Sequence, residues 1–201
     1  MKRIPIWLLC LVAGAWLPAR AAAPAGAQGA SPYYGVEIIV FRASSPGADE
    51  DWNAAVPGRG FGNTSTRGGA VPAIVKLLGA SDYHMTGLES ALKSSGAWRP
   101  IAHAAWIQTA ANWGTHTGFA LSDLGLNVPG LSGTVYVERG TYIHLGFEVK
   151  YQSGADATYT INEMRAVKYN EKQYFDHPAF GILALISPIK RGSDSAPADA
   201  H

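Results

Sequence analysis

Residues 141–151 alternate between apolar and polar side chains, and this pattern constrains the fold more than any other feature of the sequence. Every second position carries a large apolar residue: Ile143, Leu145, Phe147 and Val149. Successive side chains of a β-strand point to opposite faces, so this spacing predicts a strand with one buried and one outer face. Residues 131–138 have the same period, and the two segments are expected to form an antiparallel hairpin.

The turn between these two strands decides which residues face each other. A three-residue loop at 138–140 would place Gly140 at the last position, which favours a left-handed conformation. This loop would pair Val135 with Ile143 and keep the apolar residues on one face. It would also gather three ring-bearing side chains on the outer face: Tyr136, Tyr142 and His144.

Other strands are indicated by β-branched and aromatic content. They are expected at residues 34–41, 98–108, 158–168 and 181–186. The first and last of these are almost wholly apolar, so we expect them to lie side by side in the middle of a sheet, with both faces covered. Trp106 stands in an alanine-rich strand and is expected to be packed.

Helices are indicated in two places. Pro72 fits the first position of one or two helical turns over residues 72–78. Thr86 and Glu89 fit a capping box at the start of a second helix, which Gly96 would end. Together these elements predict an α+β fold: a single, mainly antiparallel sheet of about five or six strands, with one or two helices packed on one face.

The N-terminus resembles a secretory signal. Lys2 and Arg3 precede an apolar run that is too short to span a bilayer, and small residues follow it in an Ala-x-Ala arrangement. We therefore expect a signal peptide at 1–21, a linker at 22–32, one domain at 33–190 and a disordered tail at 191–201. Cys10, the only cysteine, falls in the signal, so a periplasmic protein without disulfides is expected.

Charge and motifs exclude several classes of function. Three of the 16 basic residues lie in the signal, which leaves 13 against 15 acidic residues, a net charge of −2. There is no basic stripe, so nucleic acid is not an expected partner. The six histidines show no metal-ligand spacing, and no phosphate-binding, dinucleotide or nucleophile-elbow motif is present. We expect no metal and no cofactor.

The segment 174–181 reads Tyr-Phe-Asp-His-Pro-Ala-Phe-Gly and leads into an apolar strand. Asp176 and His177 could act as an orienting carboxylate and a general base. Alternatively, Asp176 closes a turn and His177 bonds the backbone, while the neighbouring aromatic residues fill the end of a sheet. Adjacent residues seldom point at each other, which favours the second interpretation.

Four segments resemble the CsiV family of proteobacterial periplasmic proteins. They are Val-Glu-Ile-Ile-Val-Phe at 36–41, Ala-Ala-Trp-Ile-Gln at 104–108, Arg-Gly-Thr-Tyr-Ile-His-Leu at 139–145 and the segment at 174–181. They occur in the family's order and span nearly all of the chain after the signal. The resemblance implies a non-enzymatic, peptidoglycan-binding accessory factor of cell-wall synthesis. Its partners would be a class A penicillin-binding protein or the outer-membrane lipoprotein that activates it.

The residues and the resemblance together predict a non-catalytic protein that binds peptidoglycan in the periplasm. The candidate ligand-binding residues are Tyr136, Tyr142, His144, Asp176 and His177. Two alternatives remain open at this point: a periplasmic hydrolase that uses Asp176 and His177, and a protein-binding scaffold without glycan contact.

Overall fold

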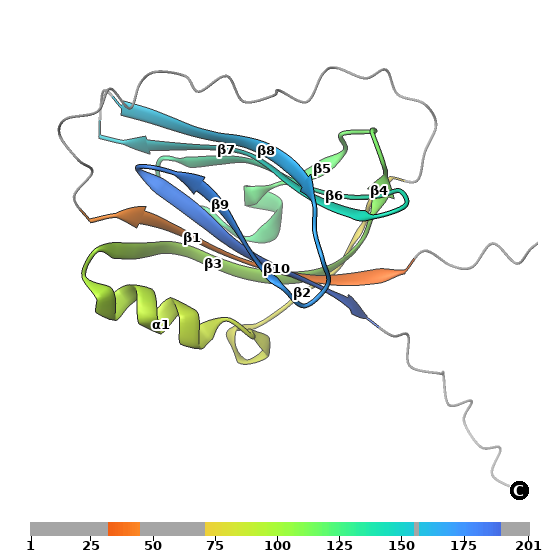
Figure 1. Cartoon of the computed structure of the whole chain (residues 1–201), viewed down its shortest axis with the longest axis horizontal. Coiled ribbons are helices and arrows are strands. Elements are labelled where there is room, and N and C mark those ends of the chain that lie inside the picture. The colour runs from red at the N-terminus through yellow and green to blue at the C-terminus, as the bar shows by residue number, and fades with distance from the viewer. Residues whose placement is uncertain (1–31, 45–70, 155–156, 190–201) are drawn as a thin grey trace, which may run out of the picture. The chain divides into compact units, whose positions relative to one another are not determined.

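The computed structural model describes residues 32–44, 71–154 and 157–189. These residues form two five-stranded β-sheets that share one hydrophobic core (Figure 1). The first sheet has the order β2-β3-β1-β10-β9 and is antiparallel throughout. The second has the order β4-β6-β7-β8, with β5 also on β6, and only the short β4–β6 pair is parallel.

The first sheet is built around β1 (Tyr33–Ala43), which lies between β3 (Trp98–Thr109) and β10 (Phe180–Ile189). Eight of its eleven residues are buried, six of them in an unbroken run over 36–41, because the second sheet covers one face and a helix covers part of the other. The predicted pairing of the two apolar strands is therefore confirmed. Trp106 on β3 is fully buried, as predicted. The outer strands are β2 (Ile74–Leu77) and β9 (Lys172–His177).

The second sheet contains β6 (Leu131–Arg139), β7 (Ile143–Ser153) and β8 (Ala157–Ala166). The predicted alternation is confirmed, because Ile143, Leu145, Phe147 and Val149 are all buried. They face the inner side of the first sheet. Phe147, for example, meets Phe175 of β9 edge-on, with ring centroids 4.6 Å apart.

The predicted register of the β6–β7 hairpin is wrong. Val135 pairs with Phe147 rather than Ile143, and Arg139 pairs with Ile143, so that the loop is 140–142. The shift moves each partner by four residues and keeps every side chain on its predicted face. Gly140 is not left-handed and serves a different purpose, since a Cβ there would lie 3.0 Å from the Cβ of Trp113.

The single α-helix among the described residues, α1 (Thr86–Ser95), lies on the side of the first sheet that faces away from the second (Figure 1). Gly96 ends it in the left-handed conformation, as predicted. The predicted capping box is wrong, because the N-cap is Met85 and no side chain of the helix caps it. The predicted helical turn at 72–78 is also wrong, since residues 74–77 form edge strand β2.

Short elements connect the strands. They are η1 (Ala80–Asp82), β4 (Ala111–Asn112), β5 (Gly118–Ala120) and η2 (Leu121–Leu124). The last three lie between β3 and β6 along the chain. The α+β class with antiparallel pairing is confirmed, but the strands form two sheets rather than one.

Arg165 of β8 joins the edges of the two sheets. Its guanidinium donates to the carbonyl oxygen of Tyr174 on β9 and lies 4.2 Å from the ring centroid of Phe175. The same guanidinium contacts Glu163 at 3.1 Å. One side chain thus bridges the last strand of each sheet.

The expected signal at 1–21, the linker except Pro32, and the tail at 191–201 lie outside the described residues. No helix in the described part of the chain is both long and apolar enough to cross a membrane.

Gly133 on β6 is expected to tolerate no side chain. Its φ is +141°, and a Cβ would lie 2.1 Å from the Glu148 carbonyl oxygen of β7. Gly133→Ala should lower the free energy of unfolding by about 3 kcal/mol in urea denaturation. Gly87→Ala is the control: no atom lies within 4 Å of that Cβ, and alanine in a helix should raise stability by about 0.5–1 kcal/mol. Equal changes in the free energy of unfolding for Gly133→Ala and Gly87→Ala would show that the close approach of β7 to Gly133 is not the cause.

Candidate functional site

The outer face of the second sheet carries the candidate site. The register of β6 and β7 gives the pairs of neighbouring residues on this face: Glu138 lies beside His144, Tyr136 beside Gly146, and Thr134 beside Glu148. On β8 the corresponding neighbours are Ala166, Met164 and Asn162. This face is therefore largely polar, in contrast to the aliphatic inner face.

Three side chains form what we call the tip cluster, at the end of the β6–β7 hairpin: Trp113, Tyr142 and His144. The indole of Trp113 stacks on the His144 imidazole, with ring centroids 3.7 Å apart and an interplanar angle of 26°. Trp113 remains 52% exposed and Tyr142 67% exposed, the latter in the loop that closes the hairpin. Two large ring systems are thus presented to solvent at one place.

Glu138 fixes the loop that carries Trp113. Its side chain is fully buried, and its carboxylate accepts hydrogen bonds from the backbone N–H groups of Gly114 (2.7 Å) and His116 (2.5 Å). The N–H of Trp113 donates to the Arg139 carbonyl oxygen at 3.1 Å. Because a buried carboxylate needs such donors, the loop is held against the hairpin and Trp113 keeps its position over His144.

His144 is held as a neutral ring beneath the indole. Burial lowers its pKa below the ordinary 6.5, although a hydrogen bond with the Tyr142 backbone and the nearby Glu138 carboxylate act in the opposite direction. A neutral imidazole offers a flat surface on which an indole packs without the need to solvate a charge. His144 therefore supports Trp113 rather than acting as a free acid or base.

Tyr136 lies on the predicted face, but it is less accessible than expected. It is only 8% exposed, and its hydroxyl donates to a Glu148 carboxylate oxygen at 3.2 Å. Burial, with Glu148 close by, raises its pKa. The structure therefore brings Tyr142 and His144 together, with Tyr136 next to them as part of the floor.

Asp176 and His177 do not join this group. His144 pairs with Ala166 and Tyr151 with Tyr159, and the ring of Tyr159 contacts that of His177. His177 therefore lies near the opposite end of these strands, roughly 23 Å along β7 from His144, at 3.3 Å per residue.

His177 and Asp176 also point to opposite faces of β9. His177 is buried against Tyr159 and Phe180, and its Nδ1 accepts a hydrogen bond from the N–H of Ala179 at 3.2 Å. Burial lowers its pKa. Asp176 is exposed on the other face and accepts a hydrogen bond from the Tyr174 hydroxyl at 2.5 Å. The expected backbone bond of His177 is confirmed, and the two side chains do not form a base and its orienter.

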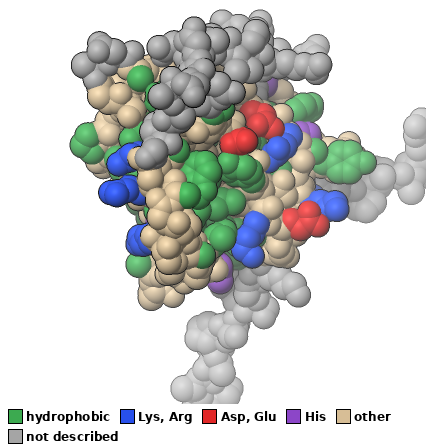
Figure 2. Space-filling model, turned by 60° about the vertical axis from the view of Figure 1, so that its left-hand side comes forward, with side chains coloured by type: hydrophobic (Ala, Val, Ile, Leu, Met, Phe, Trp, Pro, Cys, Tyr) green, Lys and Arg blue, Asp and Glu red, His purple; other side chains and the backbone are tan. Residues whose placement is uncertain are grey.

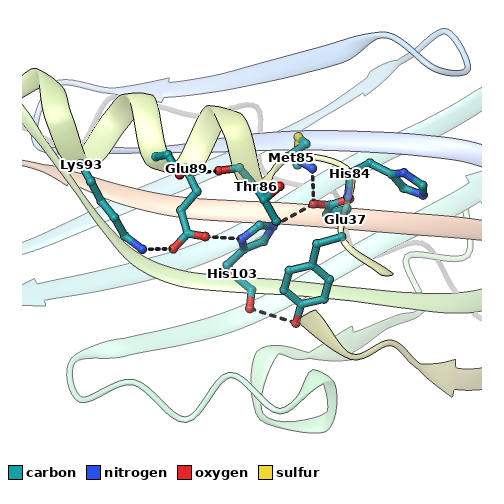
Figure 3. Close-up of polar contacts among 9 residues, drawn as sticks. Glu37, His84, Met85, Thr86, Glu89, Lys93 and His103 are labelled. Atoms are coloured by element: carbon teal, nitrogen blue, oxygen red, sulfur yellow. Dashed lines mark hydrogen bonds and ion pairs between the residues drawn. The ribbon is translucent and has the colours of Figure 1, made fainter. Parts of the chain in front are cut away.

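A second polar centre lies between α1 and the first sheet (Figure 3). The imidazole of His103 on β3 contacts Glu37 of β1 through Nε2 (2.8 Å) and Glu89 of α1 through Nδ1 (2.9 Å). The Glu37 carboxylate also accepts the N–H groups of His84 and Met85, each at 2.7 Å. Glu37 is 3% exposed.

This centre attaches α1 to the sheet. Ionised carboxylates only accept hydrogen bonds, so both His103 contacts are hydrogen bonds when the ring carries both protons. Lys93 contacts Glu89 at 2.6 Å, and hydrogen bonds from Lys93 and then His103 lower the pKa of the Glu89 carboxyl. The Glu37 carboxylate binds the N–H groups of the two residues that precede the first helical residue, Thr86, and so holds the chain where α1 begins.

Sequence reasoning missed Glu138, the role of Trp113 and the Glu37–His103–Glu89 centre. Glu37 is the one charged residue inside an otherwise apolar strand, and that anomaly was a usable signal. Trp113, like Trp98 and Trp106, was a candidate for stacking on a glycan, but nothing in the sequence indicated that it would reach His144, because it lies in an irregular connection whose course depends on the fold.

No protein-family model, no curated protein and no solved structure matches this chain. Among the described residues, no group of three or more histidine, cysteine, aspartate or glutamate side chains is arranged to hold a metal ion.

Glu37→Gln should release α1 from the sheet. The single oxygen of a glutamine amide cannot accept the N–H groups of His84 and Met85 together with the hydrogen bond from His103. The NH₂ group of the amide would instead point at one of these donors. The free energy of unfolding should fall by about 3–5 kcal/mol, and amide hydrogen exchange in α1 should accelerate. Glu171→Gln, at a carboxylate 54% exposed, should change stability by less than about 0.5 kcal/mol. Unchanged exchange in α1 would refute the attachment role.

Acid should destabilise the protein in two steps. The pKa values of His144 and His177 are lowered in the folded state, so their contribution is complete above the unfolded value of about 6.5 and is lost as the pH falls through the folded values. The lowered pKa of Glu89 adds a second loss, below its ordinary 4.5. Urea midpoints should therefore be lower at about pH 5.5 than at about pH 7.5. His144→Gln should reduce this difference, whereas substitution of the exposed His84 by Gln should preserve it.

Proposed function

We propose that this protein is a non-catalytic peptidoglycan-binding protein that contacts the glycan through the tip cluster. The observation that carries the proposal is the pair of exposed ring systems, Trp113 and Tyr142, at one hairpin end. Flat aromatic faces beside polar groups suit the apolar faces and hydroxyl groups of sugar rings.

The tip cluster is pre-organised for such a contact. His144 supports the indole from below, the missing side chain of Gly140 leaves room for it, and Glu138 holds its loop. Because the indole is fixed before binding, little of its side-chain entropy is lost when a ligand stacks on it.

Polar partners lie farther along the same outer face, roughly 13 Å (Glu148) and roughly 20 Å (Lys150) along β7 from His144, at 3.3 Å per residue. Glu148 and Lys150 are exposed on the same face of β7, and Asn162 lies opposite Glu148 on β8. These groups can donate and accept hydrogen bonds with sugar hydroxyl and acetamido groups. Affinity for one saccharide would be modest, and the repeating polymer would strengthen it by offering many equivalent sites.

The proposed compartment is the periplasm, where peptidoglycan lies. Two sequence features support it: the signal-like residues 1–21, and the four segments that resemble the CsiV family. On the same basis the protein would support cell-wall synthesis by a class A penicillin-binding protein or its outer-membrane lipoprotein activator.

One observation favours an additional protein contact. Edge strand β2 and the residues before it expose Val71 (77%), Val75 (48%) and Leu77 (47%). Apolar side chains also reach the surface in the view of Figure 2, with lysine and arginine side chains at their margins. An exposed apolar edge strand suits strand addition by a partner protein. The hydrolase alternative gains no comparable support, since His177 is buried and turned away from Asp176.

Co-sedimentation with purified peptidoglycan sacculi tests the proposal. The wild-type protein should sediment with sacculi, and Trp113→Ala combined with Tyr142→Ala should reduce the bound fraction about tenfold. Tyr142→Phe should retain binding, because the ring face is kept. Leu77→Ala is the control for loss of exposed apolar surface elsewhere and should bind normally. A wild-type protein that stays in solution would overturn the glycan proposal, and full binding by the double variant would overturn the assignment to the tip cluster.

A further inference from the structure

A second group of aromatic side chains lies on the outer face of the first sheet, on the other side of the core from the tip cluster. Three side chains form it, and we call it the aromatic corner: Phe41 of β1, which is buried, Trp98 of β3, which is half-buried, and Tyr174 of β9, which is 41% exposed. The Phe41 and Tyr174 rings are nearly parallel (18°), with centroids 5.9 Å apart. Trp98 stands at 88° to Phe41, with centroids 5.3 Å apart. Two ring planes thus meet a third at a right angle.

Gly181 makes this arrangement possible. It pairs with Phe41 on one side and with Asp176 on the other, so it lies on the same face between them. A Cβ at Gly181 would lie 2.7 Å from Phe41 Cζ and 2.8 Å from Tyr174 Cε2. Because there is no side chain at this position, rings from β1 and β9 converge over β10.

A carboxylate borders the corner. Asp176 is exposed, and the Tyr174 hydroxyl donates to its Oδ1 at 2.5 Å. Burial and the Asp176 carboxylate raise the pKa of Tyr174, so that the phenol stays protonated and keeps donating. Because the Tyr174 hydroxyl proton is already bonded to Asp176, the polar side-chain atoms at the corner are left as hydrogen-bond acceptors. The Asp176 carboxylate gives this group a full negative charge.

Neither Arg165 of β8 nor Lys172 of β9 neutralises this charge. The Arg165 guanidinium is bound to the Tyr174 carbonyl oxygen, Glu163 and the face of Phe175, a core residue on the opposite face of β9. Lys172 is on the same face as Asp176, but four residues along β9, roughly 13 Å away at 3.3 Å per residue. Among the residues that the structure describes, no basic side chain forms an ion pair with Asp176.

We propose that the aromatic corner and Asp176 bind an alkylammonium group of the lysine type. The exposed ring of Tyr174 and the half-buried indole of Trp98 attract a cation through their quadrupoles, and the alkyl chain packs on the same two rings, which the buried Phe41 supports from behind. Asp176 supplies the counter-charge and the hydrogen-bond acceptors that an ammonium needs. A neutral sugar would not need the anionic rim, which distinguishes this surface from the tip cluster. The proposal does not rest on the glycan-binding function.

Nuclear magnetic resonance titration of the full chain tests this site through the indole N–H of Trp98. The probes are a blocked lysine amide and a blocked norleucine amide, which keeps the alkyl chain without the ammonium. The lysine amide should shift the Trp98 resonance in a saturable manner, and high salt should weaken the binding. The norleucine amide should bind at least about tenfold more weakly.

Variants assign the effect to particular residues. Asp176→Asn and Tyr174→Leu should each weaken lysine amide binding about tenfold. Asp82→Asn, an exposed aspartate on η1, is the matched control and should leave binding unchanged. Trp113→Ala should also leave it unchanged, so that this site and the glycan site fail or succeed separately.

Three results would overturn the proposal. The first is equal binding of the norleucine and lysine amides, and the second is full lysine binding by Asp176→Asn. The third is a Trp98 shift caused by a chitin oligosaccharide but not by the lysine amide, which would make the corner a second glycan surface.

Discussion

The packing of two inner sheet faces against each other is the constraint on which the rest of the structure depends. Phe147 and Phe175 meet across this contact, within a cluster of mostly aliphatic side chains. Because the inner face is filled, every second residue of β6 and β7 is directed outward. The polar face and the ring systems at the hairpin end are therefore consequences of core packing, as is the separation of this face from the one that carries Asp176.

Two buried glutamates, Glu37 and Glu138, position the parts that pack on the outer faces. Each accepts two backbone N–H groups from a segment distant in sequence, Glu37 from residues 84–85 and Glu138 from residues 114 and 116. A buried carboxylate without hydrogen-bond donors would be strongly unfavourable, so each glutamate holds in place the segment that supplies its donors. The first fixes the start of α1 and the second fixes the loop of Trp113.

The sequence was sufficient for the strands with strong local patterns. The alternation in 141–151 predicted both the buried and the outer face, and apolar content predicted that β1 and β10 are neighbours. The hairpin register was not predictable in this way, because a shift by four residues leaves the alternation unchanged. The split into two sheets depends on long-range pairing. Of the predicted site, Tyr142 and His144 meet as expected, whereas Trp113 reaches them only through its loop's bonds to Glu138 and Arg139.

Arg165 has a consequence for how molecules of this protein meet one another. A last strand with open backbone groups can recruit a strand from a second molecule, which leads to aggregation. On β9 the carbonyl oxygen of Tyr174 is already occupied by the Arg165 guanidinium, which also places a positive charge at this border. An incoming strand would have to displace it and expose the ring of Phe175, so this side of the molecule resists uncontrolled polymerisation.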